Sequence, residues 1–306
     1  MRDGAGSEAI HDIQLDVIPS ITRMLVRAAI TRKTKQATPH FLPITITARS
    51  IRADAKRLAK FQDVCGFAAT EQLPLPYPHI MAFALHLQLM LEPGFPLTPT
   101  GAVHIRNRIR QTRALTVDDS MDFTVSLDDS RQVAKGYEID IITEVRVGNE
   151  LIWDDLSTML LRHGRPETKE QTEIKAQTKP APAVIPSFDN SVSWHLAANK
   201  GRQYAAASGD YNPIHLYLFT ARLMGFKRQI MHGMWSKSRS VAHLMQQAYS
   251  GPAEVDVWFK LPVFLPSTVS LYYSNTNSGI DFEMRDSEGK KPHMKGSLQL
   301  SGGPGQ

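Results

Sequence analysis

The stretch YAAASGDYNPIHLYLFTARLMGFKRQIMHGM, Tyr204 to Met234, places many polar and turn-forming residues close together. Eight consecutive positions hold Ser208, Gly209, Asp210, Asn212, Pro213 and His215, and a further glycine, Gly233, directly follows a histidine. An Asn-Pro corner bends the chain, so side chains five residues apart can converge on one water molecule instead of pointing apart. This pattern predicts a chemical site built around a turn.

The composition is that of a globular protein. The chain has 306 residues, 42% hydrophobic and 21% charged, which suits one large domain or two of ordinary size. No run approaches the roughly 20 apolar residues that span a bilayer, and the polar start lacks the apolar core of a secretory signal. The single cysteine, Cys65, excludes an intramolecular disulfide. We therefore expect a cytoplasmic protein with no membrane span.

The charge distribution is uneven. No acidic residue lies between Asp16 and Asp54, a region rich in arginine and lysine, and the formal charge is +5. One interpretation is a solvated basic flank; another is attraction of a phosphate-bearing substrate or an acidic carrier protein. The chain has no zinc-finger spacing, aromatic RNA-binding signature or long basic helix. Binding to nucleic acid is therefore not expected.

The chain divides into two halves of similar layout. Residues 165–186 are rich in charge, Gln, Thr and Pro, which is typical of a linker. We expect one half at 1–164 and the other at 187–306, each with a short helix, a long apolar helix and several alternating strands. The long helices are predicted at Tyr77–Leu91 and His232–Ala248 from apolar residues at helical spacing. This order indicates an internal duplication and an α+β fold.

The segments YAAASGDYNPIH and GFKRQIMHGM resemble the MaoC-like, (R)-specific enoyl-CoA hydratase family, whose signature runs S-G-D-x-N-P-x-H and then x-H-G-M. The segment FKLPVFLPSTV, residues 259–269, is similar to the strand after that family's central helix. The resemblance implies a hot-dog fold. The duplicated layout resembles the double hot-dog members, which include (R)-3-hydroxyacyl-thioester dehydratases, and a homodimer of double hot-dogs is a further possibility.

The residues themselves suit this chemistry. Adding water across a double bond conjugated to a thioester requires a base for the water, an acid for the α carbon and stabilisation of the enolate oxygen. Asp210 and His215 can supply the first two. Gly233 lies at a predicted helix start, where backbone N–H groups lack intrahelical partners and the dipole favours negative charge. It also lacks a side chain that would block a carbonyl.

The family resemblance implies that Asp210 and His215 form the catalytic pair and that Gly233 is the oxyanion donor. Ser208 and Asn212 are predicted to shape the turn and to border the substrate, and His232 is predicted to be structural. No redox cofactor or metal is expected: Asp210, His215, His232 and His243 show no recognised ligand spacing. Coenzyme A or acyl carrier protein is expected only as the carrier of the substrate.

The first half departs from the signature. Aligning Gly66 with Gly209 puts Phe67 opposite Asp210 and Gln72 opposite His215, so this half lacks the acid and the base. Its apolar helix then either walls a tunnel for an acyl chain or is plain core. The candidate tunnel residues are Ile80, Phe83, Ala84 and Leu87.

We therefore expect a hydro-lyase that interconverts 2-enoyl and (R)-3-hydroxyacyl thioesters in fatty acid metabolism. The alternatives are a hot-dog thioesterase and a non-catalytic acyl-binding or partner subunit.

Overall fold

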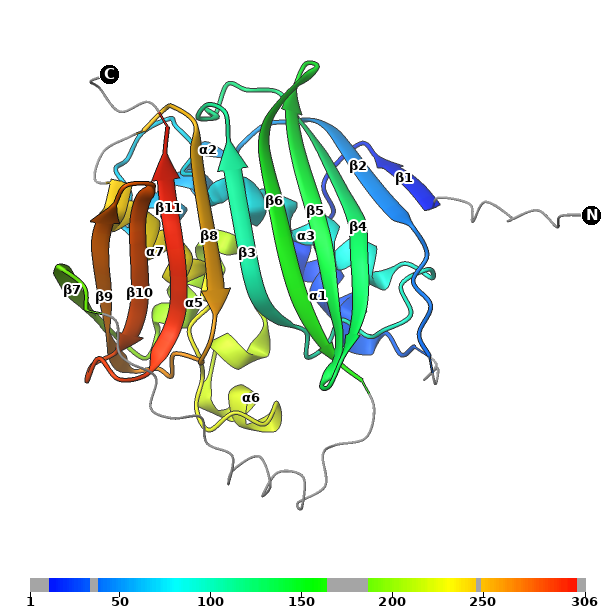
Figure 1. The fold of residues 1–306 in the computed structure, drawn as a ribbon. Coiled ribbons are helices and arrows are strands. Elements are labelled where there is room, and N and C mark those ends of the chain that lie inside the picture. The colour runs from blue at the N-terminus through cyan, green and yellow to red at the C-terminus, as the bar shows by residue number, and fades with distance from the viewer. Residues whose placement is uncertain (1–10, 34–37, 164–186, 246–248, 302–306) are drawn as a thin grey trace, which may run out of the picture.

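The computed structural model describes residues 11–33, 38–163, 187–245 and 249–301. Among these residues, eleven strands form one sheet, and the helices lie against one of its faces (Figure 1). The predicted linker, residues 165–186, lies outside the described residues. No helix within the described ranges is both long enough and apolar enough to cross a membrane.

The first half carries the elements that end at Arg162. In chain order these are β1 (His11–Leu15), α1 (Ile21–Ile30), β2 (Ile44–Ile51), α2 (Ala55–Cys65), α3 (Tyr77–Leu91), β3 (Val103–Gln111), β4 (Met121–Val133), β5 (Gly136–Val147) and β6 (Glu150–Arg162). The long apolar helix has the bounds expected from its periodicity. It begins at Tyr77 with a proline in its first turn, where the missing N–H group costs no hydrogen bond.

The second half repeats this plan. Its elements are β7 (Asn190–Leu196), α5 (Lys200–Ser208), the 3₁₀ turn η1 (Pro213–His215), α6 (Leu218–Leu223), α7 (Gly233–Met245), β8 (Ala253–Phe259), β9 (Ser267–Thr276), β10 (Gly279–Asp286) and β11 (Pro292–Leu300). Helix α7 begins one residue after the predicted start at His232, and residues 246–248 lie outside the described part.

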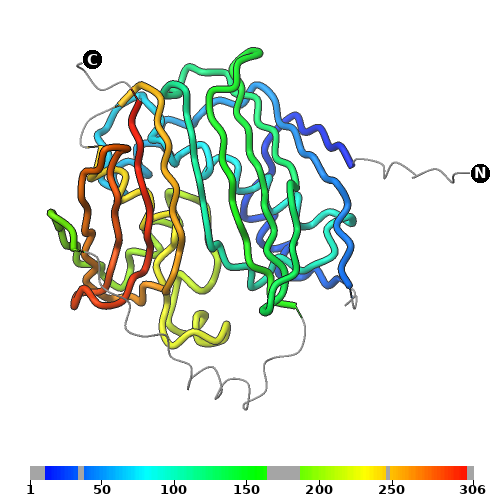
Figure 2. Tube along the Cα trace, in the orientation of Figure 1, coloured from blue at the N-terminus to red at the C-terminus, as the bar shows by residue number. Residues whose placement is uncertain are grey.

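The strand order shows how the halves join. One half runs β2-β4-β5-β6-β3 and the other β7-β9-β10-β11-β8, and the two copies meet where β3 pairs with β8 in antiparallel register. Blue-to-green segments fill one side of the molecule, and yellow-to-red segments fill the other (Figure 2). The sheet is therefore continuous, and the helices of the two halves face each other on its covered side.

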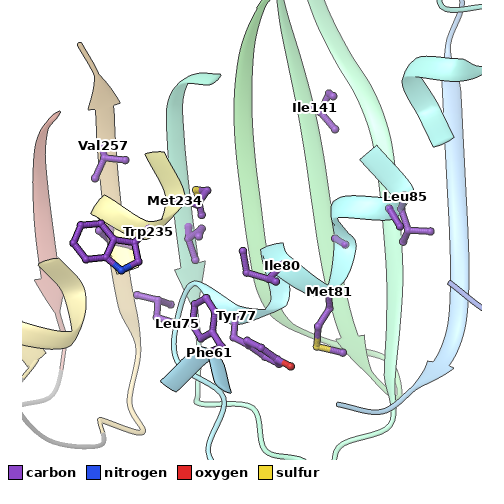
Figure 3. Packing of buried hydrophobic residues seen from close by; sticks show 14 of the residues in the cluster. Phe61, Leu75, Tyr77, Ile80, Met81, Leu85, Ile141, Met234, Trp235 and Val257 are labelled. Atoms are coloured by element: carbon purple, nitrogen blue, oxygen red, sulfur yellow. The ribbon is translucent and has the colours of Figure 1, made fainter. Parts of the chain in front are cut away.

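The core lies between the sheet and the helices α3 and α7. Tyr77 and Ile80 at the start of α3, Phe61 of α2 and Trp235 of α7 are all buried there (Figure 3). Thirteen of the fifteen residues of α3 are buried, because elements pack around it on all sides. Tyr77 of α3 and Trp235 of α7 lie in the first turns of their helices. The first N–H groups of these two helices, which lack acceptors within the helix, are therefore near the junction of the halves.

The basic flank is more structured than a solvated tail. Residues 17–53 contain α1 and β2, and Met24, Ala28, Ile44 and Ile46 of these elements are buried. Lys33 donates a hydrogen bond to the carbonyl of Glu92 at 2.6 Å, and partial burial lowers the pKa of its amine to about 8. The arginines Arg23, Arg27, Arg32, Arg49 and Arg52 are exposed, so the basic side chains face solvent while the apolar face of α1 is buried.

Candidate active site

The turn after α5 is held by hydrogen bonds two residues apart. Helix α5 ends at Gly209 in the left-handed conformation, φ 79°. The N–H of Asp210 donates to Ser208 Oγ at 3.2 Å, and the N–H of Asn212 donates to Asp210 Oδ1 at 3.1 Å. Asn212 Oδ1 in turn accepts from the N–H of Ile214 at 3.4 Å and caps η1. Each polar side chain fixes the next residue, so the backbone of the turn is set.

His215 is oriented by the segment that precedes α7. Its Nδ1 lies 2.8 Å from the carbonyl oxygen of Ile230, and the N–H of Ile230 donates to the carbonyl of Ile214 at 3.0 Å. Because a carbonyl only accepts, Nδ1 carries the proton and Nε2 is the nitrogen left for chemistry. Burial lowers the pKa of His215, while the Asp210 carboxylate opposes that effect.

The structure brings Asp210, His215 and His232 together. Ligand atoms of the three side chains lie within 4.8 Å of one another, a separation that one water molecule can bridge. Asp210 has a quarter of its side chain exposed, whereas both histidines are buried. The pair predicted from the sequence is therefore placed so that both groups reach one small molecule.

His232 supports the other two residues. Its ring stacks on His215 with centroids 3.6 Å apart, and its Nε2 donates to the backbone carbonyl of Asp210 at 2.9 Å. The Nε2 atom is 3.8 Å from Asp210 Oδ2, too far for a hydrogen bond. Burial holds the pKa of His232 well below its usual value. A neutral, stacked histidine that anchors the backbone of Asp210 agrees with a structural role.

Gly233 is the first residue of α7 and directly follows His232, which contacts both residues of the pair. A Cβ placed there would lie 3.0 Å from Cδ1 and Cε1 of Phe259 on β8. The glycine thus leaves room for an aromatic ring as well as for an approaching carbonyl. The need for space beside Phe259 was not visible in the sequence.

The remaining predicted residues lie on α3. Ile80, Ala84 and Leu87 are buried in the core, and Phe83 is partly buried. A row of aromatic contacts connects the start of α3 to the site: Tyr77 to Phe61 (5.1 Å), Phe61 to Tyr204 (6.2 Å) and Tyr204 to His232 (4.7 Å). The structure does not put the four α3 residues in contact with Asp210 or His215, so their role in substrate binding stays a prediction.

The turn of the first half also begins with a left-handed glycine but has different chemistry. Gly66 ends α2 with φ 78°, as Gly209 ends α5, but Phe67 stacks on Phe61 with ring centroids 6.1 Å apart. The amide of Gln72 donates to the carbonyl of Tyr249. A cavity opens here between the halves and is lined by Phe67, Gln72, Leu75, Met245 and Tyr249 among others.

Comparison with known proteins agrees with this geometry. Residues 176–296 match the family model for the MaoC like domain, and this range contains the turn, His215 and the start of α7. The match therefore spans most of the second half, which is similar to this domain. The chain is also 29% identical over 256 residues to 3-hydroxyacyl-thioester dehydratase X of Mycobacterium tuberculosis, covering 83% of this chain and 89% of that protein.

Solved structures show the fold. The crystal structure of that mycobacterial protein, HtdX, matches with a TM-score of 0.70 and 28% identity, over 84% of this chain and all of that chain. A MaoC-like dehydratase from Phytophthora capsici matches with a TM-score of 0.65 and 18% identity, over 85% and 96%. An acyl-ACP thioesterase from Bacteroides thetaiotaomicron matches at 0.51 with 9% identity, over 85% and 98%. The α+β hot-dog prediction is confirmed, and the fold alone does not choose between these activities.

Three residues around the candidate site had been given no role from the sequence. Tyr204 and Phe259 lie in the quoted segments of the second half, but the S-G-D-x-N-P-x-H and x-H-G-M signature does not include them. Their contacts with His232 and with the position of Gly233 come only from the structure. Arg57 reaches the turn from the first half and is 150 positions away from Ala207, whose carbonyl it contacts. Nothing in the local sequence around Arg57 signals that contact.

Proposed function

We propose that this protein is a hydro-lyase that adds water to trans-2-enoyl thioesters, giving (R)-3-hydroxyacyl thioesters, and catalyses the reverse dehydration. The observation that carries the proposal is the approach of Asp210 and His215 to within 4.8 Å beside the start of α7. The similarity to the mycobacterial 3-hydroxyacyl-thioester dehydratase supports it.

Asp210 and His215 act as base and acid. In hydration, Asp210 takes a proton from water as the oxygen bonds to carbon 3, and His215 Nε2 delivers a proton to carbon 2; dehydration reverses both transfers. Besides the proton that stays on His215 Nδ1, the pair therefore holds one transferable proton before and after the reaction, first on His215 Nε2 and then on Asp210. Since burial disfavours the imidazolium, the ionised carboxylate of Asp210 is needed to keep that proton on His215.

The N–H of Gly233 stabilises the enolate. Charge builds up on the thioester oxygen when water adds to carbon 3, and the first N–H groups of α7 lack helical acceptors. The helix dipole adds to this stabilisation. In this role the backbone acts directly and no metal is required, so added chelator is expected to leave the rate unchanged.

The carrier is proposed to be coenzyme A or an acyl carrier protein, both of which are anionic. No acidic residue occurs between Tyr211 and Ala253, and Arg222, Lys227 and Arg228 are exposed around the end of α6. These charges lie in the segment that links η1 to α7, next to the proposed site. They favour a negatively charged carrier group.

The acyl chain is proposed to extend toward α3. The aromatic row from His232 to Tyr77 is an apolar path from the site to the first turn of that helix, where Ile80 follows. A cytoplasmic location and a homodimer of double hot-dogs remain parts of the proposal, to be tested by cell fractionation and light scattering.

The test is hydration of crotonyl-CoA, followed as loss of the enoyl-thioester absorbance, with assay of free thiol in the same samples. We expect hydration without thiol release, and a loss of roughly 100-fold or more in turnover for Asp210→Asn and for His215→Gln. His195→Gln, at an exposed position on β7, is the matched control and should retain turnover. Release of thiol would indicate a thioesterase, and no turnover on any chain length would indicate a non-catalytic acyl-binding subunit.

A further inference from the structure

The two short helices, α2 and α5, pack against each other across the junction of the halves. Each ends in a left-handed glycine, Gly66 in one half and Gly209 in the other, with φ values of 78° and 79°. The last carbonyl groups of a helix have no intrahelical donors and carry partial negative charge. At both ends, an arginine from the other half supplies those donors.

Arg57 supplies them at the catalytic turn. Its Nε donates to the carbonyl of Ala207 at 3.0 Å, and its Nη2 donates to the carbonyl of Ser208. Its guanidinium also lies against Gly209, where a Cβ would be 3.0 Å from Nη2. The backbone N–H of Arg57 donates to Asp54 Oδ1 at 2.8 Å, so the arginine is itself fixed in the first turn of α2.

The two carbonyls that Arg57 binds come immediately before the turn. Ser208, whose carbonyl it binds, also presents Oγ to the N–H of Asp210. Two bonds from one planar guanidinium fix the orientation of the last peptides of α5, from which Asp210 leaves the helix. We propose that Arg57, from the half that lacks an acid-base pair, is a positioning residue for Asp210. The inference rests on the proposed hydro-lyase function.

Arg239 of α7 makes the corresponding contact where no chemistry is expected. Its Nη1 donates to the carbonyl of Cys65 at 3.2 Å, and its guanidinium lies against Gly66. The residue that follows is Phe67 rather than an acid. Arg57 makes two hydrogen bonds to helix-end carbonyls, whereas Arg239 makes one and also lies over the ring of Trp194 at 4.5 Å. Only Arg57 holds a helix end that leads to Asp210. Arg239 is therefore a control for the loss of an arginine that caps a helix end.

The experiment compares Arg57→Met, Arg57→Lys and Arg239→Met on crotonyl-CoA, with thermal unfolding of each. We expect Arg57→Met to lose about tenfold or more in kcat with KM changed less than threefold, because substrate contacts are retained while the base is misplaced. Arg57→Lys should recover part of kcat. Arg239→Met should show a similar fall in Tm and near-normal kcat.

Several results would overturn the inference: normal kcat in Arg57→Met, equal kcat losses in both methionine variants, or a loss confined to KM. If Arg57→Met does not fold, kcat and Tm are compared for Arg57→Lys and Arg239→Lys instead. Lysine keeps the positive charge but loses the paired donors of the guanidinium. An inactive wild-type protein would instead count against the proposed function, which distinguishes the two failures.

Discussion

At Gly233 an added side chain would meet two neighbours, a protein ring and the proposed thioester. A Cβ at Gly233 would lie 3.0 Å from the ring of Phe259. The N–H of Gly233 is the proposed oxyanion donor. A loss of activity after a substitution there is ambiguous, because displacement of Phe259 and exclusion of substrate have the same outcome. Relieving the contact with the ring separates the two.

We predict that Gly233→Ala lowers kcat/KM about tenfold or more, in the direction seen when an oxyanion donor is lost. Combining it with Phe259→Ala should restore the Tm lost to crowding but not the turnover, since the methyl group would still face the thioester oxygen. The measurement is steady-state kinetics with thermal unfolding for the two single variants and the double variant. Recovery of turnover in the double variant would show that the glycine serves packing alone.

At the scale of elements, α3 and α7 have the same place in the two halves and different surroundings. Helix α7 carries its glycine at the junction, whereas α3 begins with Tyr77 and is buried along most of its length. Ala84 has no exposed surface, so a large residue there would disrupt the core before it narrowed any tunnel. Phe83, which is partly buried, is the better probe of whether an acyl chain passes α3.

We predict that Phe83→Trp lowers kcat/KM for a twelve-carbon enoyl-CoA at least fivefold more than for a four-carbon one. Each buried methylene contributes about 0.8 kcal/mol, so loss of contact with two or three groups is enough. Phe83→Leu serves as the control that keeps the site apolar without enlarging the side chain. Equal losses for both substrates would mean that α3 is scaffold rather than a wall of the acyl site.

At the scale of the whole molecule, buried polar groups lie where the two halves meet. His79 Nδ1 lies 2.6 Å from Asp155 Oδ2, and the amine of Lys237 on α7 donates to the carbonyl of Asn107 at 3.0 Å. His86 and His104 lie in the same region, and burial lowers the pKa of each to about 3. Both histidines are therefore neutral in the folded protein at neutral pH. Between pH 6.5 and about 3, they bind protons in the unfolded chain but not in the folded one.

Acidification should therefore destabilise the protein before its carboxylates titrate. The unfolded histidines take up protons as the pH falls below 6.5 toward 3, so the stabilisation present above 6.5 is progressively lost. At pH 5 the cost is about 2 kcal/mol for each such histidine. Urea unfolding at pH 7.5 and pH 5 should show this fall, and His104→Phe should reduce it. An equal fall in wild type and variant would contradict the assignment to His104.

Local sequence determined the turn of the second half and the long helix of the first. Asp210, Asn212 and Ser208 act on the backbone within two residues, so the turn could be predicted from residue types and spacing. The bounds of α3 followed from its apolar spacing and from the proline in its first turn. These features depend on interactions over a few positions of the chain, which a sequence shows directly.

Only the tertiary structure decided the contacts between distant segments. The bonds from Arg57 to the end of α5, the ring of Phe259 at Gly233 and the pairing of β3 with β8 join residues that the chain separates by 26 to about 150 positions. The buried face of α1 was missed for the same reason, because its partners come from other elements. Such contacts depend on how the elements pack, and no local pattern encodes which partner each residue meets.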